Sequence, residues 1–332
     1  MKLFITGANG FIGSSLCRFF LALGWEVHGL VRPKSDLHNL EGLPVHLHRG
    51  DLRDPGSFAI PAGTTHVIHS ASIVSDTADE TTCRDNIYLL AVNLVAKLRA
   101  LPQPPQRLLY ISTALVLGYN GLDISESRPG ESAMFLAYTR HKLRTEEFLR
   151  QQWRENGLPV VILRPGDVYG PYDRVSCAQM LRGCERKLPL IVGRGNCRFG
   201  FCYIDNLCQA AMLALSKPGI EGRAYTVTNG VLPTWGEFFS GLQQGVHFQQ
   251  RLRVPVWMAH ALAGVLRGVQ WVFPRYVPEI NYYRIRRITT ETTYDISQTI
   301  ADLGYRPDDQ TEKQIAAIVA WYLKEKENGH IH

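Results

Sequence analysis

Residues 2–13 read KLFITGANGFIG, an apolar run that breaks into a glycine-rich turn and then into a helix. Leu3, Phe4 and Ile5 form the kind of short run that is typical of a fully buried parallel strand. The helix after the turn carries apolar residues at helical spacing, namely Phe11, Ile12, Leu16, Phe19, Phe20 and Leu23. A strand, a glycine turn and a helix N-terminus make an anion site, because free N–H groups and the helix dipole favour a diphosphate.

The three glycines of this turn have separate expected roles. Gly7 permits the tight turn, Gly10 lets the backbone approach a pyrophosphate, and Gly13 packs the helix against the strand. The turn lies between a strand and a helix, which is the context that supports dinucleotide binding. The residues expected to contact the cofactor here are Gly7, Asn9, Gly10, Phe11, Ile12 and Gly13.

Length and composition indicate a globular protein with a main domain and a smaller one. The chain has 332 residues, of which 45% are hydrophobic and 20% are charged. The 36 Lys and Arg exceed the 30 Asp and Glu by a mild +6, and they form no basic tract with interleaved aromatics. Nucleic-acid binding is therefore disfavoured, whereas a cofactor with several phosphates is compatible with this charge.

The seven cysteines suggest neither a disulfide framework nor a zinc site, because their number is odd and no pair is spaced C-x-x-C. No metal site is expected, and a reducing, cytoplasmic compartment is expected, since the chain enters its fold by residue 2. The apolar segment 254–273 contains His260, Arg267 and Gln270. It predicts an apolar-rich amphipathic helix rather than a membrane span, and leaves room for peripheral membrane contact.

Strand-like and helix-like segments alternate along the first half of the chain. Strands are expected at residues 26–31, 45–49, 66–69 and 107–112, and helices include 86–101. This alternation predicts an α/β fold with a doubly wound parallel sheet of the Rossmann type. Ligands of such sheets bind beyond the carboxyl ends of the strands.

The residues after the second strand bear on the choice of cofactor. A basic residue at this strand end accommodates a 2′-phosphate, whereas an acidic one binds the ribose hydroxyls. Arg32 and Lys34 stand here, with no acidic residue before Asp36, so NADP(H) is favoured over NAD(H). The alternative is that Arg32 is a solvated loop residue.

Two later strand ends complete the expected cofactor site. Asp51 is expected to meet the adenine amino group and Leu52 to cover the ring. Ser70 and Ala71 form a small-residue turn that suits a close approach by the cofactor.

Tyr138 and Lys142 stand four residues apart, which in a helix puts both side chains on one face. A free tyrosine has a pKa of about 10, and a nearby ammonium favours its phenolate. Tyr138 is thus a candidate to exchange a proton with a substrate hydroxyl or carbonyl. Ser112 and Thr113 end the strand at 107–112, where a hydroxyl can bond the same substrate oxygen.

These segments together resemble the extended short-chain dehydrogenases/reductases over nearly the whole chain. The resemblance rests on TGANGFIG, Ser112-Thr113-Ala114, Tyr138–Lys142, residues 163–171 (LRPGDVYGP) and residues 303–307 (LGYRP). It implies that Thr113 is the catalytic hydroxyl, Tyr138 the proton donor or acceptor, and Lys142 the residue that grips the nicotinamide ribose. It also implies that Pro165 and Gly166, with Val168 beyond them, line the nicotinamide pocket.

Several residues favour a lipophilic carbonyl over a sugar nucleotide as substrate. Sugar 4,6-dehydratases carry Asp-Glu after the catalytic threonine, where this chain has Ala114-Leu115, and Leu117 replaces a tyrosine of many sugar enzymes. Residues 288–303 and 203–206 resemble the 3β-hydroxysteroid dehydrogenase and 3-oxoacid reductase branch. The apolar segment with Trp257 is expected either to roof a greasy pocket or to be an ordinary core helix.

Arg198 is similar in position to a diphosphate-binding arginine of the sugar-nucleotide enzymes, with Arg286 and Arg287 as a possible second clamp. The same arginines would also suit a substrate carboxylate or the surface. A nucleotide-sugar epimerase or keto-sugar reductase therefore remains an alternative, and a non-catalytic dinucleotide-binding regulator is a second one.

The preferred interpretation is an NADP(H)-dependent oxidoreductase that acts on a 3-oxo or 3-hydroxy group of a lipophilic small molecule. Residues 1–168, with a return at about 201–228, are expected to form the cofactor domain. Residues 169–200 and 229–328 are expected to form most of a discontinuous substrate domain. The family resemblance also implies a homodimer through the helices at 86–101 and 137–156.

Overall fold

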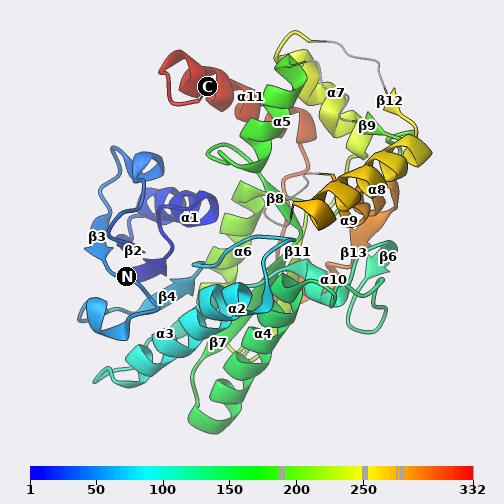
Figure 1. The fold of residues 1–332 in the computed structure, drawn as a ribbon. Coiled ribbons are helices and arrows are strands. Elements are labelled where there is room, and N and C mark those ends of the chain that lie inside the picture. Colours follow the sequence, from blue (N-terminus) through cyan, green and yellow to red (C-terminus); the bar gives the residue numbers. More distant parts are fainter. Residues whose placement is uncertain (187–190, 249–252, 274–275, 277–279, 332) are drawn as a thin grey trace.

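A seven-stranded parallel sheet lies at the centre of the molecule, in the order β11-β7-β5-β4-β1-β2-β3 (Figure 1). The structure is a computed structural model that describes residues 1–186, 191–248, 253–273, 276 and 280–331. The strands of the sheet are β1 Lys2–Thr6, β2 Glu26–Val31, β3 His46–Arg49, β4 His66–His69, β5 Arg107–Ile111, β7 Val160–Pro165 and β11 Ala224–Val227. This is the predicted Rossmann-type sheet.

The strand order reverses beside β1, because the chain runs from β1 out to β3 and then returns to β4 on the other side. Thr6 at the end of β1 pairs with Leu30 of β2 and with His69 of β4. The carboxyl ends of these strands therefore meet at one edge of the sheet. That edge, at the reversal, is where open α/β sheets bind their ligands.

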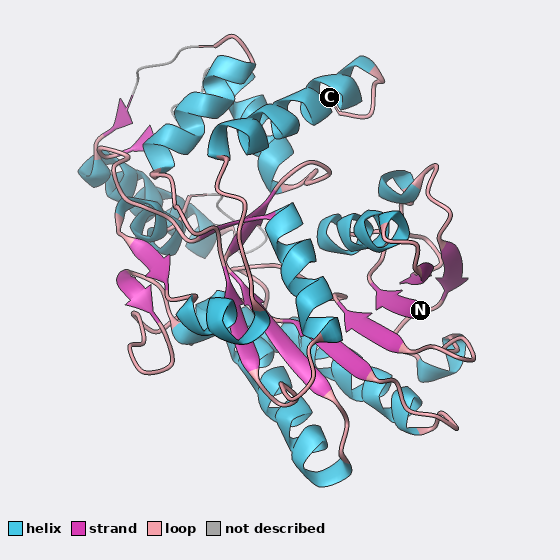
Figure 2. Cartoon of the chain, turned by 180° about the vertical axis from the view of Figure 1, so that it is seen from behind, coloured by secondary structure: helices cyan, strands magenta, loops and turns pink. Residues whose placement is uncertain are grey.

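Helices cover both faces of the sheet, which makes three layers (Figures 1 and 2). Side chains alternate along each strand, so Leu3 and Ile5 join one buried cluster and Phe4 joins another. A strand covered on both faces reads as a continuous apolar run, as residues 3–5 do. One face is covered by α1 Phe11–Ala22 and α6 Ile204–Ser216, and the other by α3 Leu89–Arg99 and α4 Ala137–Asn156.

The remaining elements form the smaller part of the molecule. The helices in or next to this smaller part are α2 Glu80–Cys83, α5 Ser176–Glu185, α7 Trp235–Gly245, α8 Val256–Val272, α9 Tyr282–Thr289, α10 Ser297–Leu303 and α11 Thr311–Glu327. Three two-stranded parallel pairs connect it, namely β6 Gly121–Ile124 with β13 Thr292–Tyr294, β8 Asp167–Tyr169 with β10 Phe201–Tyr203, and β9 Ile191–Val192 with β12 Arg253–Val254.

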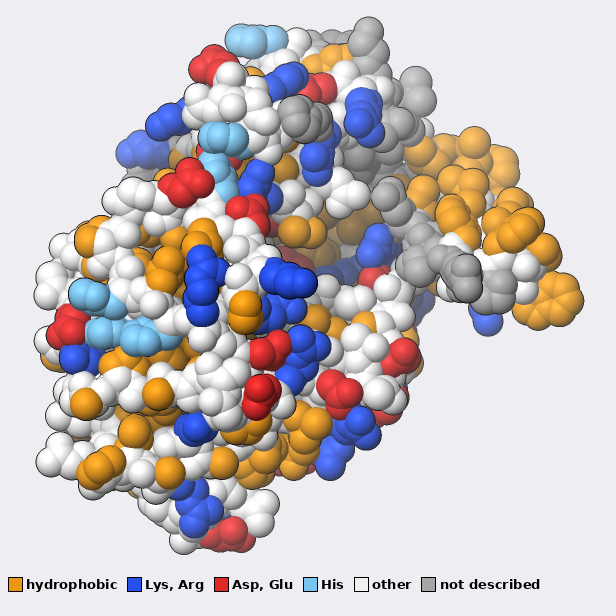
Figure 3. Space-filling model, turned by 60° about the vertical axis from the view of Figure 1, so that its left-hand side comes forward, with side chains coloured by type: hydrophobic (Ala, Val, Ile, Leu, Met, Phe, Trp, Pro, Cys, Tyr) orange, Lys and Arg blue, Asp and Glu red, His pale blue; other side chains and the backbone are white. Residues whose placement is uncertain are grey.

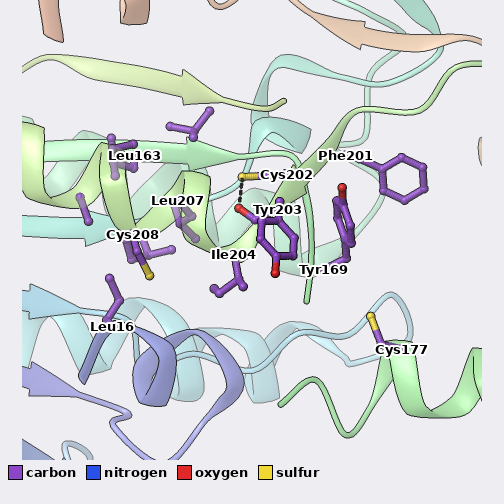
Figure 4. Close-up of a cluster of buried hydrophobic side chains, with 14 of the residues drawn as sticks. Leu16, Leu163, Tyr169, Cys177, Phe201, Cys202, Tyr203, Ile204, Leu207 and Cys208 are labelled. Atoms are coloured by element: carbon purple, nitrogen blue, oxygen red, sulfur yellow. Dashed lines mark hydrogen bonds between the residues drawn. The ribbon is translucent and has the colours of Figure 1, made fainter. Parts of the chain in front are cut away.

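One buried cluster joins the sheet to this smaller part. Around α6 it includes Leu16, Leu163 and Leu207, which converge in Figure 4, and it continues to Phe238 of α7 and Ile315 of α11. The sheet takes β11 from the expected return segment at 201–228. The division into two domains remains a prediction, because no break in this core separates them.

The observed bounds differ from the expected ones by a few residues. β3 begins at His46 rather than at residue 45, and β5 ends at Ile111 rather than at residue 112. The helix expected at 86–101 is a π-helical turn at Arg84–Tyr88 followed by α3. The segment at 254–273 is helical from Val256, directly after Pro255, since proline suits a helix start.

No helix among the described residues is long and apolar enough to cross a membrane.

Candidate active site

The glycine loop between β1 and α1 has a shape that requires glycine at two positions. Gly7 has φ +69°, and a Cβ there would lie 2.8 Å from Cα of Ala71. A Cβ on Gly13 would lie 2.1 Å from the carbonyl oxygen of Gly7. The nearest atom to a Cβ on Gly10 is 3.4 Å away, which is ordinary contact. The loop is thus packed against protein at Gly7 and Gly13, while Gly10 leaves room for a ligand.

The N-terminus of α1 suits an anion. Gly10 is its cap residue, no side chain caps it, and its first turn holds no acidic residue. The first N–H groups of a helix have no intrahelical acceptor, and they lie at the positive end of its dipole. The first of these belong to Phe11 and Ile12, and the preceding Asn9 donates from Nδ2 to the carbonyl of Asp36 at 3.1 Å. The residues therefore fit a dinucleotide diphosphate.

The end of β2 carries two exposed cations, Arg32 and Lys34. Neither has an ion-pair partner within 4.0 Å in the described part of the chain. Asp51 lies close by, where Arg53 binds its carboxylate at 2.6 Å. The hydrogen bond from Arg53 lowers the pKa of Asp51, and the charge of Arg32 adds to this effect. Leu52 is buried in the cluster that contains Phe4.

The turn after β4 packs directly on the glycine loop. Ser70 Oγ donates to the carbonyl of Thr6 at 2.7 Å, and Ala71 lies against Gly7. The Ser70 hydroxyl thus ties the ends of β4 and β1 together. A close approach by the cofactor to Ser70 and Ala71 stays a prediction.

Thr113, Tyr138 and Lys142 come together at the carboxyl end of β5. Thr113 follows the strand and accepts a hydrogen bond from the backbone N–H of Leu115 at 3.3 Å. Tyr138 stands in the first turn of α4, within hydrogen-bonding reach of Thr113. Lys142 lies one turn later, where its Nζ donates to the carbonyl of Ile111 at 2.8 Å and lies 5.8 Å from the centre of the Tyr138 ring. All three side chains are buried.

Burial dominates the protonation of this group. It raises the pKa of Tyr138, and the hydrogen bond with Thr113 only partly opposes it. Burial also lowers the pKa of Lys142 to about 7, against the attraction of Glu146. The sequence suggested that the Lys142 ammonium would favour a Tyr138 phenolate, but here desolvation has the larger effect. Tyr138 is therefore a neutral phenol with a proton to donate.

The lowered pKa of Lys142 predicts a pH-dependent stability. An unfolded lysine has a pKa of about 10.4, so between pH 7 and pH 10 the unfolded chain binds the extra proton and stability rises with pH. We expect the unfolding free energy to increase from pH 7 to pH 9 by about 2 kcal/mol more in the wild type than in Lys142→Met. Denaturant titrations of both proteins at the two pH values measure this difference. Equal increases would contradict a lowered pKa of Lys142.

Ser112, expected to bind the cofactor, has its hydroxyl in a buried ionic network. Its Oγ donates to Glu146 Oε1 at 2.5 Å. Glu146 also binds Arg164 at 2.6 Å, and Arg164 reaches Glu126 at 2.7 Å. The network links β5, α4 and β7, and so it positions the helix that carries Tyr138. The sequence pattern contained Arg164 but did not indicate its partner.

The segment after β7 passes close to the backbone at Gly200. A Cβ on Gly166 would lie 2.0 Å from the carbonyl oxygen of Gly200, so this crossing requires glycine. Pro165 ends β7 and Val168 lies in β8, half-buried. Their contact with a nicotinamide stays a prediction.

An ion pair that the sequence did not indicate lies beside Tyr138. Arg287 of α9 binds both carboxylate oxygens of Asp167 in β8. Burial raises the pKa of Asp167, and the charge of Arg287 opposes this rise. Both charges act on the phenol of Tyr138, where Arg287 lowers the pKa and Asp167 raises it. Of the arginines considered as clamps, Arg287 is therefore the one whose charge acts on Tyr138.

The predicted substrate residues lie apart from one another. Leu117 is buried with Ala114 in a small cluster. Arg198 is half-exposed and binds Glu291 at 3.2 Å, and Trp257 is exposed on α8. Contact of Leu117, Arg198 and Trp257 with a substrate stays a prediction.

A cleft of about 470 Å³ opens beside the start of α4. Its lining includes Leu136 and Ala137, the two residues before Tyr138, together with Tyr283 of α9. Helix α8 contributes Ala263, Arg267 and Gln270, and the loop before α2 contributes Asp76 and Thr77. The cleft therefore lies beside the start of α4, next to the residue that precedes Tyr138, while Tyr138 itself is buried.

Two curated relatives match almost the whole chain. The chain is 29% identical to the sterol demethylase protein B of Methylococcus capsulatus, and the match covers 100% of both chains. It is also 29% identical to the 2-alkyl-3-oxoalkanoate reductase of Shewanella oneidensis, over 91% of this chain and 81% of that protein.

A solved structure has the same fold. The UDP-glucuronic acid 4-epimerase from Bacillus cereus, in complex with UDP-glucuronic acid and NAD, superposes with a TM-score of 0.77 at 21% identity, over 98% of this chain and 99% of that one. At this identity the likeness shows the fold alone.

The family model of the NAD dependent epimerase/dehydratase family matches residues 3–228, which include the glycine loop, Thr113, Tyr138 and Lys142. These residues span the whole central sheet, from β1 to β11. The chain thus belongs to the NAD dependent epimerase/dehydratase family, within the extended short-chain dehydrogenases/reductases, and is an NAD(P)-dependent oxidoreductase.

Proposed function

We propose that this protein is an NADP(H)-dependent oxidoreductase that reduces a ketone, or oxidises the matching alcohol, at a 3-oxo or 3-hydroxy position of a lipophilic small molecule. The observation that carries the proposal is the meeting of Thr113, Tyr138 and Lys142 at the edge where the strand order reverses. An acid, a second hydroxyl and a cation in one buried place suit hydride transfer coupled to proton transfer.

The proposed cofactor fits the residues of the nucleotide site. The opening at Gly10 and the uncapped start of α1 suit the diphosphate. Arg32 and Lys34, exposed at the end of β2, suit a 2′-phosphate and favour NADP over NAD. Ser70 and Ala71 have small side chains that leave room for the cofactor, and Lys142 would hold the nicotinamide ribose.

A reduced nicotinamide bound at this site would supply the hydride that reduces the carbonyl carbon of the substrate. Tyr138 donates its phenolic proton to the carbonyl oxygen as negative charge develops there. The raised pKa of Tyr138 suits this role, because the group begins as a neutral acid. Thr113 holds the same oxygen by a hydrogen bond, and Lys142 stabilises the phenolate that remains.

Apolar residues around the catalytic threonine support a lipophilic substrate. Ala114, Leu115 and Leu117 are all buried and offer neither an acid nor a base. A dehydratase needs both, so dehydration is disfavoured. The printed names of the two relatives, a sterol demethylase protein and a 3-oxoalkanoate reductase, agree with this class of substrate.

The nucleotide-sugar alternative has less support. Its diphosphate would need Arg198, whose guanidinium binds Glu291 instead. The non-catalytic alternative would leave the buried Thr113, Tyr138 and Lys142 without a use. An activity panel distinguishes all three, with NADPH oxidation followed for lipophilic ketones and 3-oxoacyl compounds beside UDP- and dTDP-sugars. Turnover of a keto-sugar only, or epimerisation without NADPH consumption, would overturn the lipophilic assignment.

Exchanging Arg32 for aspartate is expected to reverse the cofactor preference. The change removes a charge-assisted hydrogen bond to the 2′-phosphate and adds repulsion, so KM for NADPH should rise by about 10- to 100-fold. KM for NADH should stay level or fall, since a carboxylate can bind the ribose hydroxyls. Initial rates with both cofactors measure the ratio of KM for NADPH to KM for NADH. Arg49→Asp nearby is the matched control. An unchanged ratio would mean that Arg32 is a solvated loop residue.

A cytoplasmic location and a homodimer belong to the same proposal. All seven cysteines are free thiols, and six of them are buried. Free buried thiols suit a reducing compartment. The expected dimer would use α3 and α4, whose exposed faces lie on one side of the sheet.

A further inference from the structure

Helix α8 presents a broad exposed apolar face. Its buried residues are Ala259 and Ala263, which pack with Ile285 of α9. At 100° per residue, ten apolar or glycine residues cover about half of the helix circumference on the other side. These ten, the α8 apolar face, are Trp257, Met258, Ala261, Leu262, Gly264, Val265, Gly268, Val269, Trp271 and Val272. Seven of them are exposed large apolar side chains, namely Trp257, Met258, Leu262, Val265, Val269, Trp271 and Val272. Figure 3 shows a group of hydrophobic side chains that projects at the right of the molecule.

The polar residues of α8 lie on its other side. His260 stacks on Tyr282 of α9 with ring centres 5.5 Å apart. Arg267 and Gln270 line the cleft beside α4. Apolar and polar groups are thus segregated around the helix, and no acidic residue occurs in it.

The ends of the face and the charge around it indicate what it contacts. Trp257 is 71% exposed at one end and Trp271 is 86% exposed at the other. Tryptophan is favoured at the boundary between lipid and water. The sequence from 249 to 283 contains four arginines and one acidic residue, Glu279. A strongly apolar face with aromatic ends in a cationic segment is the pattern of a helix that lies in a membrane interface.

We propose that the α8 apolar face docks on the surface of an anionic lipid bilayer. The helix of 17 residues would lie along the interface rather than cross it, in agreement with the lack of a membrane-crossing helix among the described residues. Its apolar side chains enter the acyl boundary, while Arg253, which is exposed just before the helix, meets lipid phosphates.

Charge favours a bilayer over a second copy of this chain. A twofold contact through α8 would bring the same cationic segment of both copies together. Anionic headgroups would instead neutralise the segment, and each basic residue near the surface adds to the attraction. The bilayer is therefore the occupant that matches both the apolar face and its charge.

Docking would leave the cleft on the side of α8 that faces away from the inserted side chains, because Ala263, Arg267 and Gln270 line it. A lipophilic substrate that partitions into the bilayer would then be concentrated close to the enzyme. This consequence rests on the proposed function, whereas docking itself does not.

Vesicle flotation with the full chain tests the docking. We expect binding to vesicles of phosphatidylcholine and phosphatidylglycerol, weaker binding to phosphatidylcholine alone, and weakening by salt. Leu262→Glu should reduce the partition coefficient by about tenfold, because a carboxylate replaces an inserted side chain and repels the anionic surface. Ile300→Glu on α10 is the matched control, since Ile300 is 45% exposed and Leu262 is 44% exposed.

Circular dichroism establishes that each variant is folded, and Val265→Glu serves as a second variant on the same face. Absence of binding to both kinds of vesicle would overturn the proposal, as would equal binding by Leu262→Glu and the wild type. A third result would also overturn the proposal, namely that the wild type binds no lipid but self-associates in sedimentation, and that Leu262→Glu loses this self-association. That result would assign the α8 apolar face to contact with a second copy of the chain. Ketone reduction without vesicles tests the proposed function separately.

Discussion

Replacing Tyr138 with phenylalanine is expected to lower kcat by about 10²- to 10⁴-fold, the usual contribution of one positioned acid–base group. Burial raises the pKa of this phenol, so the wild-type side chain starts with a proton to donate. Phenylalanine keeps the ring but has no proton to give. Steady-state kinetics with NADPH and the best ketone of the activity panel measure the loss.

The matched control is Tyr322→Phe on α11. Tyr322 is also buried, and its hydroxyl donates to Glu185 at 2.9 Å, far along the chain from the catalytic group. This variant should keep kcat within about twofold, since its hydroxyl takes no part in the reaction. NADPH binding by Tyr138→Phe, measured by fluorescence, should also persist. Full turnover by Tyr138→Phe would refute the mechanism and leave a different proton donor to be found.

Replacing Arg164 with methionine is expected to lower the unfolding free energy by about 3–5 kcal/mol. The side chains of Arg164 and Glu146 are only 4% and 0% exposed, so the change leaves the Glu146 carboxylate in the interior with only the Ser112 hydroxyl and the longer contact to Arg150 at 3.8 Å. The partner Glu126 is mostly exposed and can turn to water. Urea denaturation of wild type and variant measures the difference.

A second substitution separates the stranded charge from a simple loss of packing. Arg164→Met combined with Glu146→Leu should recover most of the stability, because an apolar pair can replace a buried ion pair at little cost. Arg223→Met is the surface control, since its ion pair with Asp302 is exposed and worth at most about 1 kcal/mol. If the double variant is as unstable as Arg164→Met alone, the burial of the Glu146 carboxylate without Arg164 is not the cause.

Local sequence patterns were sufficient for the sheet and its loops. The run at residues 3–5 is apolar throughout because both faces of β1 are covered, and alternate residues join separate clusters. Gly7 has φ +69°, which favours glycine, and a Cβ on Gly13 would meet the carbonyl oxygen of Gly7. Such constraints act within a few residues, and they can therefore be recognised from the sequence alone.

Element ends were less well predicted, because they depend on more distant contacts. The turn before α3 is π-helical, and Ser112 stands just past β5 with its hydroxyl on Glu146 of α4. No sequence pattern near these residues indicates either feature. Trp257 is exposed, because the packing of Ala259 and Ala263 on α9 leaves it on the other side of α8, and the sequence did not indicate which side of this helix is buried.

The sequence by itself determined the doubly wound sheet, the glycine loop, and the spacing that sets Tyr138 and Lys142 on one face of a helix. These follow from strand and helix periodicity and from the space that each residue occupies. Only the tertiary structure decided that Arg287, 149 positions after Tyr138, lies beside its phenol with Asp167. It also decided the protonation of Tyr138 and Lys142, because desolvation depends on every chain segment that packs around a charge.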